Sequence, residues 1–206
     1  MEARYHRQVL RRALGERMSA RALAAVMAAN LGQDSLWGLL HPVYHFDSSR
    51  FAEALAYMET SRAEAAHTTT PAAAWAAFGR LSHAAADFYS HSNYVALWLA
   101  RQAMASPGVE AIDGLDPALL KHPDLISGHI YWQDVLYLAP ALRPWLRRHA
   151  PANSHARMNL DSPAMGPLFP YSIEAAVQRT VAEFNRTLAA IGEERGQAAM
   201  QSFCDR

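Results

Sequence analysis

The sequence predicts an all-α fold, organised as a single multi-helix bundle over residues 1–206. Apolar residues recur with helical rather than alternating spacing almost throughout the chain, which is typical of amphipathic helices. The chain is rich in alanine, and 51% of its residues are hydrophobic. A chain of 206 residues is long enough to bury a substantial core in one domain.

Helix start and stop signals place the first helices. Residues 3–14 form a short amphipathic pattern that ends near Gly15. Ser19 is a suitable cap for a second helix over residues 19–31, which Gly32 closes. The apolar part of this helix is too short to span a bilayer, so a buried core helix is predicted. A short helical piece over residues 34–40 follows.

The longest predicted helix runs over residues 71–103, with Thr70 as its cap and Pro71 at its first position. Gly79 is the one residue within it that disfavours a helix. The remaining predicted helices cover residues 49–65, parts of 118–137, and a segment whose last residues are 143–149. An amphipathic closing helix over 170–191 follows, and a short helix and a frayed tail end the chain.

Three polar residues of the long helix, His83, Asp87 and His91, follow one another at intervals of four. In a helix such residues stand one above the other on the same face. Imidazole and carboxylate are ligands that suit zinc, and hydrophobic packing does not require them. The alternative explanation is a local His–Asp hydrogen bond, with the third polar residue on a solvent-exposed face of the helix. The triple spacing favours a metal site.

Other polar residues gather outside this helix, each with a structural alternative. The loop from His41 to Ser49 contains His45 and Asp47, and Asp47 could instead cap the next helix. His67 precedes the long helix and could serve as a helix-end histidine. His155 and Asn159 repeat the interval of four, although a set of turns has the same composition. His6 would ordinarily be a surface histidine.

These residues resemble the sequence blocks of a known family. The segment from His83 to Asn93, with its D-F-Y-S-H-S-N run, resembles the signature helix of the HET-C-like branch of the zinc-dependent phospholipase C and single-strand nuclease superfamily. Shorter blocks extend the similarity over most of the chain: Tyr5-His6-Arg7, the end of the second predicted helix from Ala29 to Asp34, His45-Phe46-Asp47, and the segment from Ser154 to Asp161.

The resemblance implies an all-α bundle of the zinc-dependent phospholipase C type that holds up to three zinc ions. Asp47, His67, His83 and Asp87 would surround one ion, and Asp87 would bridge to a second ion bound by His6. His91 and His155 would hold a third, with Asn159 near the position where the phospholipases use a glutamate. Asp47 would also orient or deprotonate the attacking water.

The predicted function is therefore metal-dependent phosphodiester hydrolysis of the phospholipase C type, with a phospholipid or another phosphodiester as substrate. A zinc nuclease acting on single-stranded nucleic acid is one alternative. The formal net charge of zero argues against it, because polynucleotide binding depends on neutralising phosphates. The other alternative is a non-catalytic interaction module with a structural metal site. The oligomeric state is left open.

Membrane contact and location are further questions that the sequence raises. Six aromatic residues could form a lipid-facing rim, although large aromatics at helical spacing more often belong to the core: Trp37, Tyr44, Tyr94, Trp98, Trp132 and Trp145. The basic residues near 143–148 complement a helix C-terminus.

The single cysteine, Cys204, excludes an intrachain disulfide. Because no secretory signal is evident, a cytoplasmic location is expected, or a secreted or periplasmic one if a leader was removed.

Overall fold

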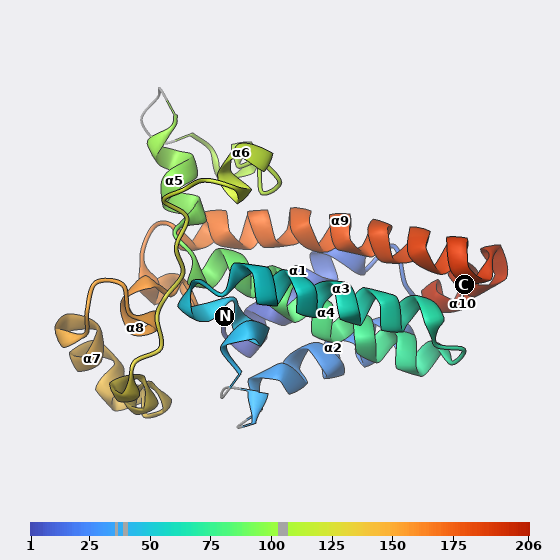
Figure 1. The fold of residues 1–206 in the computed structure, drawn as a ribbon, viewed down its shortest axis with the longest axis horizontal. Helices are drawn as coiled ribbons and strands as arrows, with labels where there is room; N and C mark the ends of the chain where they lie inside the picture. The colour runs from blue at the N-terminus through green and yellow to red at the C-terminus, as the bar shows by residue number, and fades with distance from the viewer. Residues whose placement is uncertain (36, 39–40, 103–106) are drawn as a thin grey trace.

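The computed structural model is an all-α bundle, as the sequence predicts (Figure 1). It describes residues 1–35, 37–38, 41–102 and 107–206. Within these ranges there are no β-strands, only two isolated bridges, Ser92–Ser127 and His129–Ser154. None of the described helices combines the length and apolar character needed to cross a membrane. The α-helices have the following bounds: α1 Ala3–Leu14, α2 Ala20–Leu31, α3 Phe51–His67, α4 Pro71–His91, α5 Tyr94–Ala100, α6 Pro117–Leu120, α7 Arg143–His149, α8 His155–Met158, α9 Phe169–Arg195 and α10 Gln197–Cys204.

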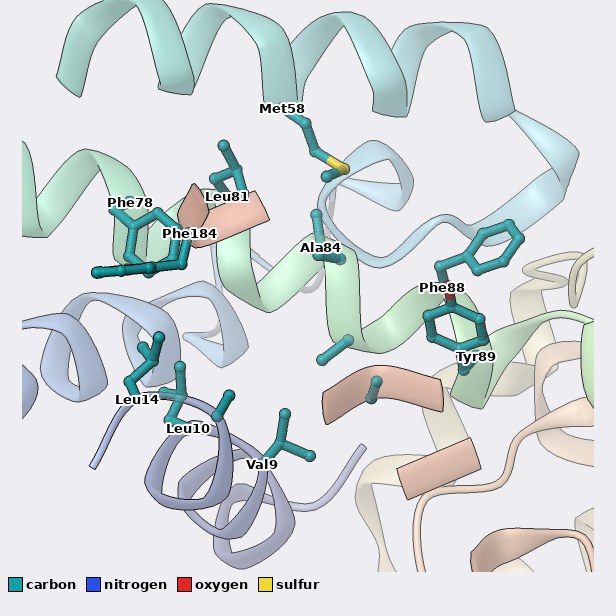
Figure 2. Packing of buried hydrophobic residues seen from close by; sticks show 14 of the residues in the cluster. Val9, Leu10, Leu14, Met58, Phe78, Leu81, Ala84, Phe88, Tyr89 and Phe184 are labelled. Carbon is teal, nitrogen blue, oxygen red and sulfur yellow. The ribbon is translucent and has the colours of Figure 1, made fainter. Parts of the chain in front are cut away.

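Helix α4 is the centre of the bundle, and helices α1, α2, α3 and α9 pack around it. Residues 81–92 are all buried, which means that the C-terminal half of α4 has no solvent-facing side. A helix in such a position is expected to be apolar all round. Figure 2 shows part of this core, including Phe78, Leu81 and Phe88 of α4. The Phe78 ring packs against Phe184 of α9, and the Phe88 ring packs against Phe51 of α3.

Several predicted helix ends are confirmed. The hydroxyl of Ser19 accepts a hydrogen bond from the Ala22 amide and caps α2, and Thr70 caps α4 in the same way through the Ala73 amide. The short helical piece predicted over residues 34–40 lies partly outside the described residues. A 3-10 turn over Gly32–Asp34 overlaps this piece only at Asp34.

The prediction of one continuous helix over 71–103 is wrong, because α4 ends at His91 and α5 begins at Tyr94. Ser92 is extended, with φ −107° and ψ 167°. The side chain of Asn93 accepts a hydrogen bond from the Ile126 amide and donates one to the Asp124 carbonyl, each at 2.9 Å. These long-range contacts with residues 124–127 replace the local helical bonds, and helical periodicity alone could not reveal them.

Gly79 lies at the contact between α2 and α4. A Cβ atom at this position would lie 2.6 Å from both the Val26 carbonyl oxygen and the Ala29 Cβ. We expect Gly79→Ala to lower the free energy of unfolding by about 1–3 kcal/mol, because the overlap outweighs the gain of about 1 kcal/mol in helix propensity. Denaturant unfolding followed by circular dichroism measures this change. Gly32→Ala is the matched control, because its Cβ would have no neighbour within 4 Å, and an equal loss in both variants would contradict the expectation.

Candidate metal centre

The buried half of α4 carries three polar side chains in an otherwise apolar environment. His83 and Asp87 are 0% exposed, and His91 is 4% exposed. Their spacing of four residues places them along one side of the helix, as predicted. They lie at the end of the bundle where the loop after α2 and the chain around α8 meet α4 (Figure 1).

The first cluster, which we call the Asp87 group, consists of His6, Asp34, His83 and Asp87. Each contributes one potential ligand atom, and these atoms all lie within 4.8 Å of one another. The Asp87 carboxylate lies 3.2 Å from His6 Nε2 and 3.0 Å from His83 Nε2. Asp34 Oδ1 lies 3.6 Å from the same His83 nitrogen. Atoms bound to one tetrahedral zinc at ordinary bond lengths are separated by about 3.3 Å, so these separations suit a shared ion.

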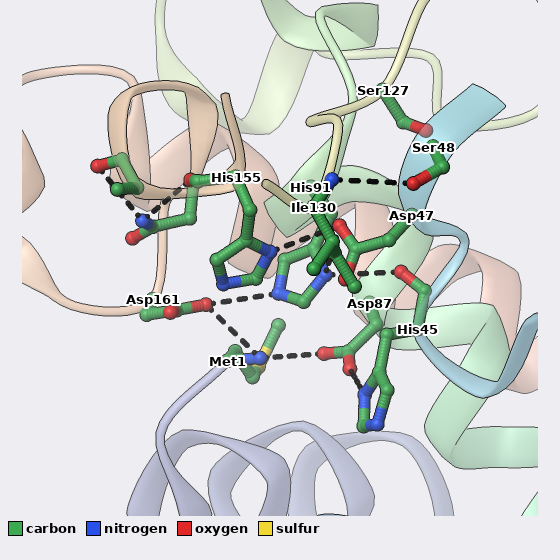
Figure 3. Close-up of polar contacts among 12 residues, drawn as sticks. Met1, His45, Asp47, Ser48, Asp87, His91, Ser127, Ile130, His155 and Asp161 are labelled. Atoms are coloured by element: carbon green, nitrogen blue, oxygen red, sulfur yellow. Dashed lines mark hydrogen bonds and ion pairs between the residues drawn. The ribbon is translucent and has the colours of Figure 1, made fainter. Parts of the chain in front are cut away.

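His45 and the amino group of Met1 complete the surroundings of Asp87. His45 Nδ1 lies 2.9 Å from Asp87 Oδ2 and 3.1 Å from His83 Nε2. The Met1 amino group donates to Asp87 at 2.6 Å and lies 3.2 Å from Asp161 (Figure 3). A positively charged group thus lies between the buried carboxylate of Asp87 and the partly buried carboxylate of Asp161, which is the electrostatic arrangement that favours a cation.

The second cluster, the Asp47 group, consists of Asp47, His91 and His155. Asp47 Oδ1 lies 2.9 Å from His155 Nδ1 and 3.4 Å from His91 Nδ1. Asp161 lies beside it, 3.1 Å from His91 Nε2 (Figure 3). The two groups are adjacent, because the His45 ring is 5.0 Å from the His83 ring and 6.1 Å from the His91 ring.

The loop that presents Asp47 has an unusual backbone. Phe46, Ser48 and Ser49 have φ values of 56°, 58° and 54°, in the left-handed region that non-glycine residues rarely adopt. The segment 127–130 holds this conformation. The Ser48 amide donates to the Gly128 carbonyl at 2.8 Å, and the Ser49 amide donates to Ser127 Oγ at 2.8 Å. Backbone strain that long-range contacts maintain is common at functional sites.

Neighbouring positive charges keep the carboxylates of Asp87 and Asp47 ionised, whereas burial and the Asp87 charge raise the pKa of Asp34. Burial alone would raise the pKa of Asp87, but the positively charged Met1 amino group outweighs it and lowers the pKa well below its ordinary value. Burial likewise opposes ionisation of Asp47, and His155 and His91 lower its pKa below the usual range. The site therefore offers anionic oxygens, which a divalent cation requires.

His83 of the Asp87 group and His91 of the Asp47 group differ in the direction in which their pKa is shifted. Burial lowers the pKa of His83 well below its ordinary value in spite of Asp87, which keeps this ring neutral. Burial also disfavours the charged form of His91, but Asp47 and Asp87 raise its pKa well above the ordinary value. His83 is thus ready to bind a metal, whereas His91 releases a proton when it becomes a ligand.

Several buried ring nitrogens have no hydrogen-bond partner among the described residues. They are both nitrogens of His6, Nδ1 of His83 and Nε2 of His45. His6 Nε2 is 3.2 Å from Asp87, yet the geometry is not that of a hydrogen bond. A buried polar atom without a partner costs roughly 1–3 kcal/mol, so their accumulation beside two carboxylates needs a cause. A bound zinc ion would satisfy His6 Nε2, and the residue types of both groups fit that ion.

Two predicted ligands lie outside these groups. His67 is at the C-terminal end of α3, where its side chain is 67% exposed and 3.8 Å from Glu194. The structure therefore does not bring it to His83. Asn159 is buried near His155, but its amide nitrogen donates to the carbonyls of His155 and Ala156 at 2.8 and 3.2 Å, which are ordinary bonds at a helix end.

Three residues that the sequence reasoning did not name as ligands lie in or beside the groups: Asp34, His45 and Asp161. His45 could have been predicted as a ligand, because it lies two residues before Asp47 in a loop dense in metal-binding side chains. Asp34 follows a helix end and Asp161 follows a short polar helix, and both positions are common for aspartates with purely structural roles.

Comparison with known proteins gives a family for the chain. The family model described as the VWA7 N-terminal domain matches residues 6–110, about half of the chain, so the chain belongs to this family. No curated protein and no solved structure matches it. The matched span includes the whole Asp87 group together with Asp47 and His91, whereas His155 and Asp161 lie beyond it.

Proposed function

We propose that this member of the VWA7 N-terminal domain family is a zinc-dependent phosphodiester hydrolase with a two-ion centre, and that its substrate is a phospholipid. The observation that carries the proposal is the pair of adjacent, buried ligand groups, four residues around Asp87 and three around Asp47. Two ions a few ångströms apart are the usual arrangement for phosphodiester cleavage. The resemblance of the segment from His83 to Asn93 to phospholipase C-like proteins supports the reaction class.

Zinc in such a pair polarises the phosphoryl oxygens and lowers the pKa of water toward neutrality. The protein residues would supply the rest. His6, Asp34, His83 and Asp87 would hold one ion, and Asp47, His91 and His155 would hold the other. We assign Asp47 the further role of orienting the attacking water, because its position in a strained loop between the two histidines fixes the carboxylate.

The first test is elemental analysis of the purified protein after zinc loading, followed by turnover assays. We expect zinc in both groups and hydrolysis of short-chain phosphatidylcholine, with little cleavage of single-stranded DNA. Cleavage of the DNA alone would make the protein a nuclease. Zinc-dependent stability without turnover of either substrate would indicate a structural metal site. Absence of zinc after loading would contradict the proposal itself.

Gly128 allows the Asp47 group to be tested separately. A Cβ atom at this position would lie 2.6 Å from the Cα and 3.0 Å from the amide nitrogen of His155. We expect Gly128→Ala to displace α8, so that the protein loses the ion of the Asp47 group and keeps the ion of the Asp87 group. Zinc analysis of Gly128→Ala beside Gly32→Ala measures this difference. Unchanged zinc content in Gly128→Ala would show that His155 is not a ligand.

A further inference from the structure

Large apolar side chains are exposed in one region of this protein. Eight such residues are exposed in the described part of the chain, and six of them lie within residues 126–145. Trp132 is 82% exposed and Trp145 is 54% exposed, and Leu142 is 41% exposed. By contrast, Tyr94 and Trp98 are buried in the core. Exposed large apolar residues that are concentrated in one region are a feature of interaction sites.

The same region has a concentrated positive charge. Residues 135–160 contain four arginines and no aspartate or glutamate, although the whole chain has a formal net charge of zero. Arg147, Arg148 and Arg157, together with Pro144, line a cavity of about 430 Å³. None of these three arginines forms an ion pair with a described carboxylate. Arg147 and Arg157 each donate one long hydrogen bond, of 3.4 Å, to a backbone carbonyl, that of Ala164 and that of Ala150 respectively. The guanidinium groups keep further donors, and phosphate is the anion that matches their geometry.

The apolar and basic features share one structural unit. Leu146, Ala150 and Ala156 form a small apolar cluster of their own, which joins α7 to α8 in a lobe at one end of the bundle (Figure 1). On α7 the exposed residues Trp145 and Arg148 are three apart and share one helix face. The lobe thus presents an aromatic and a basic residue on the same helix face, with the Trp145 ring stacked on His149.

Helix α8 separates this lobe surface from the metal centre. His155 Nδ1 lies 2.9 Å from Asp47, whereas Arg157 lines the cavity. Residues two apart on a helix point in roughly opposite directions, about 200° apart. The arginine cavity is therefore outside the two ligand groups, yet it is only one short helix away from them.

We propose that the lobe formed by residues 130–149 and α8 is a docking surface for membranes containing anionic phospholipids. Trp132, Trp145 and Leu142 would enter the interfacial layer, and Arg147, Arg148 and Arg157 would bind lipid phosphates. Tryptophan and arginine together are typical of residues at the membrane interface. Nucleic acid would use the arginines but would leave the exposed leucine without a contact. Docking does not require the metal centre to be catalytic, because different residues carry it.

Sedimentation of the full chain with vesicles tests this surface without turnover, in the presence of a chelator. We expect stronger binding to vesicles of phosphatidylcholine with phosphatidylserine than to phosphatidylcholine alone, and weaker binding at high salt. Each arginine near an anionic leaflet contributes about five-fold to the partition coefficient, so Arg147→Gln/Arg148→Gln should weaken binding about 25-fold. Trp132→Ala/Trp145→Ala should weaken binding to both kinds of vesicle.

Matched controls make the result decisive. Arg11→Gln/Arg17→Gln removes the same charge from exposed positions outside the lobe, and Leu55→Ala removes an apolar side chain that is 49% exposed on α3, also outside the lobe. Both controls should bind as the unchanged protein does. Absence of vesicle binding, or equal losses in lobe and control variants, would overturn the proposal. So would dimerisation or single-stranded DNA binding that the lobe variants abolish while vesicle binding remains. Zinc content and phosphodiester turnover, measured separately, report on the proposed hydrolase alone.

Discussion

Replacing Asp87 with asparagine is expected to abolish zinc binding by the Asp87 group and to destabilise the protein strongly. The carboxylate is completely buried and contacts His83, His45, His6 and the Met1 amino group. Removing one partner of a buried charged network costs about 3–5 kcal/mol. At roughly 2–4 °C per kcal/mol for a chain of this size, the thermal midpoint of the metal-free protein should fall by about 6–20 °C.

Elemental analysis and thermal unfolding measure the two effects of Asp87→Asn independently. His67→Ala is the control, because it removes a histidine that the sequence predicts as a ligand and that the structure places on the surface. We expect His67→Ala to keep both its zinc and its stability. Stoichiometric zinc in the Asp87 group of Asp87→Asn would refute the assignment of this group, and zinc loss in His67→Ala would show that the ligands are different.

Glu183→Gln is expected to cost a similar amount of stability without touching the metal centre. Glu183 is completely buried on α9 and accepts hydrogen bonds from Arg62 at 2.5 Å, Arg179 at 2.7 Å and Arg186 at 3.1 Å. Glutamine has nearly the same shape, but it leaves these guanidinium groups without their shared negative charge. Loss of such a partner costs about 3–5 kcal/mol, measurable by denaturant unfolding.

Glu59 provides the matched control for Glu183, because it pairs with the same arginine, Arg62, on the surface of α3. Its side chain is 69% exposed, and an exposed pair of this kind contributes about 0.2–1 kcal/mol. We therefore expect Glu59→Gln to be nearly neutral. Equal effects of the two substitutions would mean that burial does not govern the strength of this network. Zinc content should be unchanged in both variants.

The sequence was sufficient for most of the fold where the information is local. Caps at Ser19 and Thr70 and the amphipathic pattern of the closing helix all refer to residues a few positions apart. The closing helix, predicted over 170–191, is longer in the structure, where α9 covers Phe169–Arg195. The break between α4 and α5 was missed because Asn93 is held by residues more than thirty positions away.

The residues of the candidate site likewise divide into those that local sequence predicts and those that it does not. The stripe of His83, Asp87 and His91 follows from helix geometry alone, since residues four apart share a face whatever surrounds them. Helix geometry does not predict which other ligands join these residues. Asp34 rather than His67 lies beside His83, and Asp47 lies with His91 and His155 rather than with His83.

The sequence by itself therefore determined an all-α bundle with a polar stripe on its longest helix. Only the tertiary structure decided how the ligands divide between two groups and which exposed aromatic and basic residues form one surface. The physical reason is the range of the interactions. Helix periodicity and capping depend on neighbours within about four residues, whereas Asp47 and His155, 108 positions apart, meet only when α4, the strained loop and α8 are packed together.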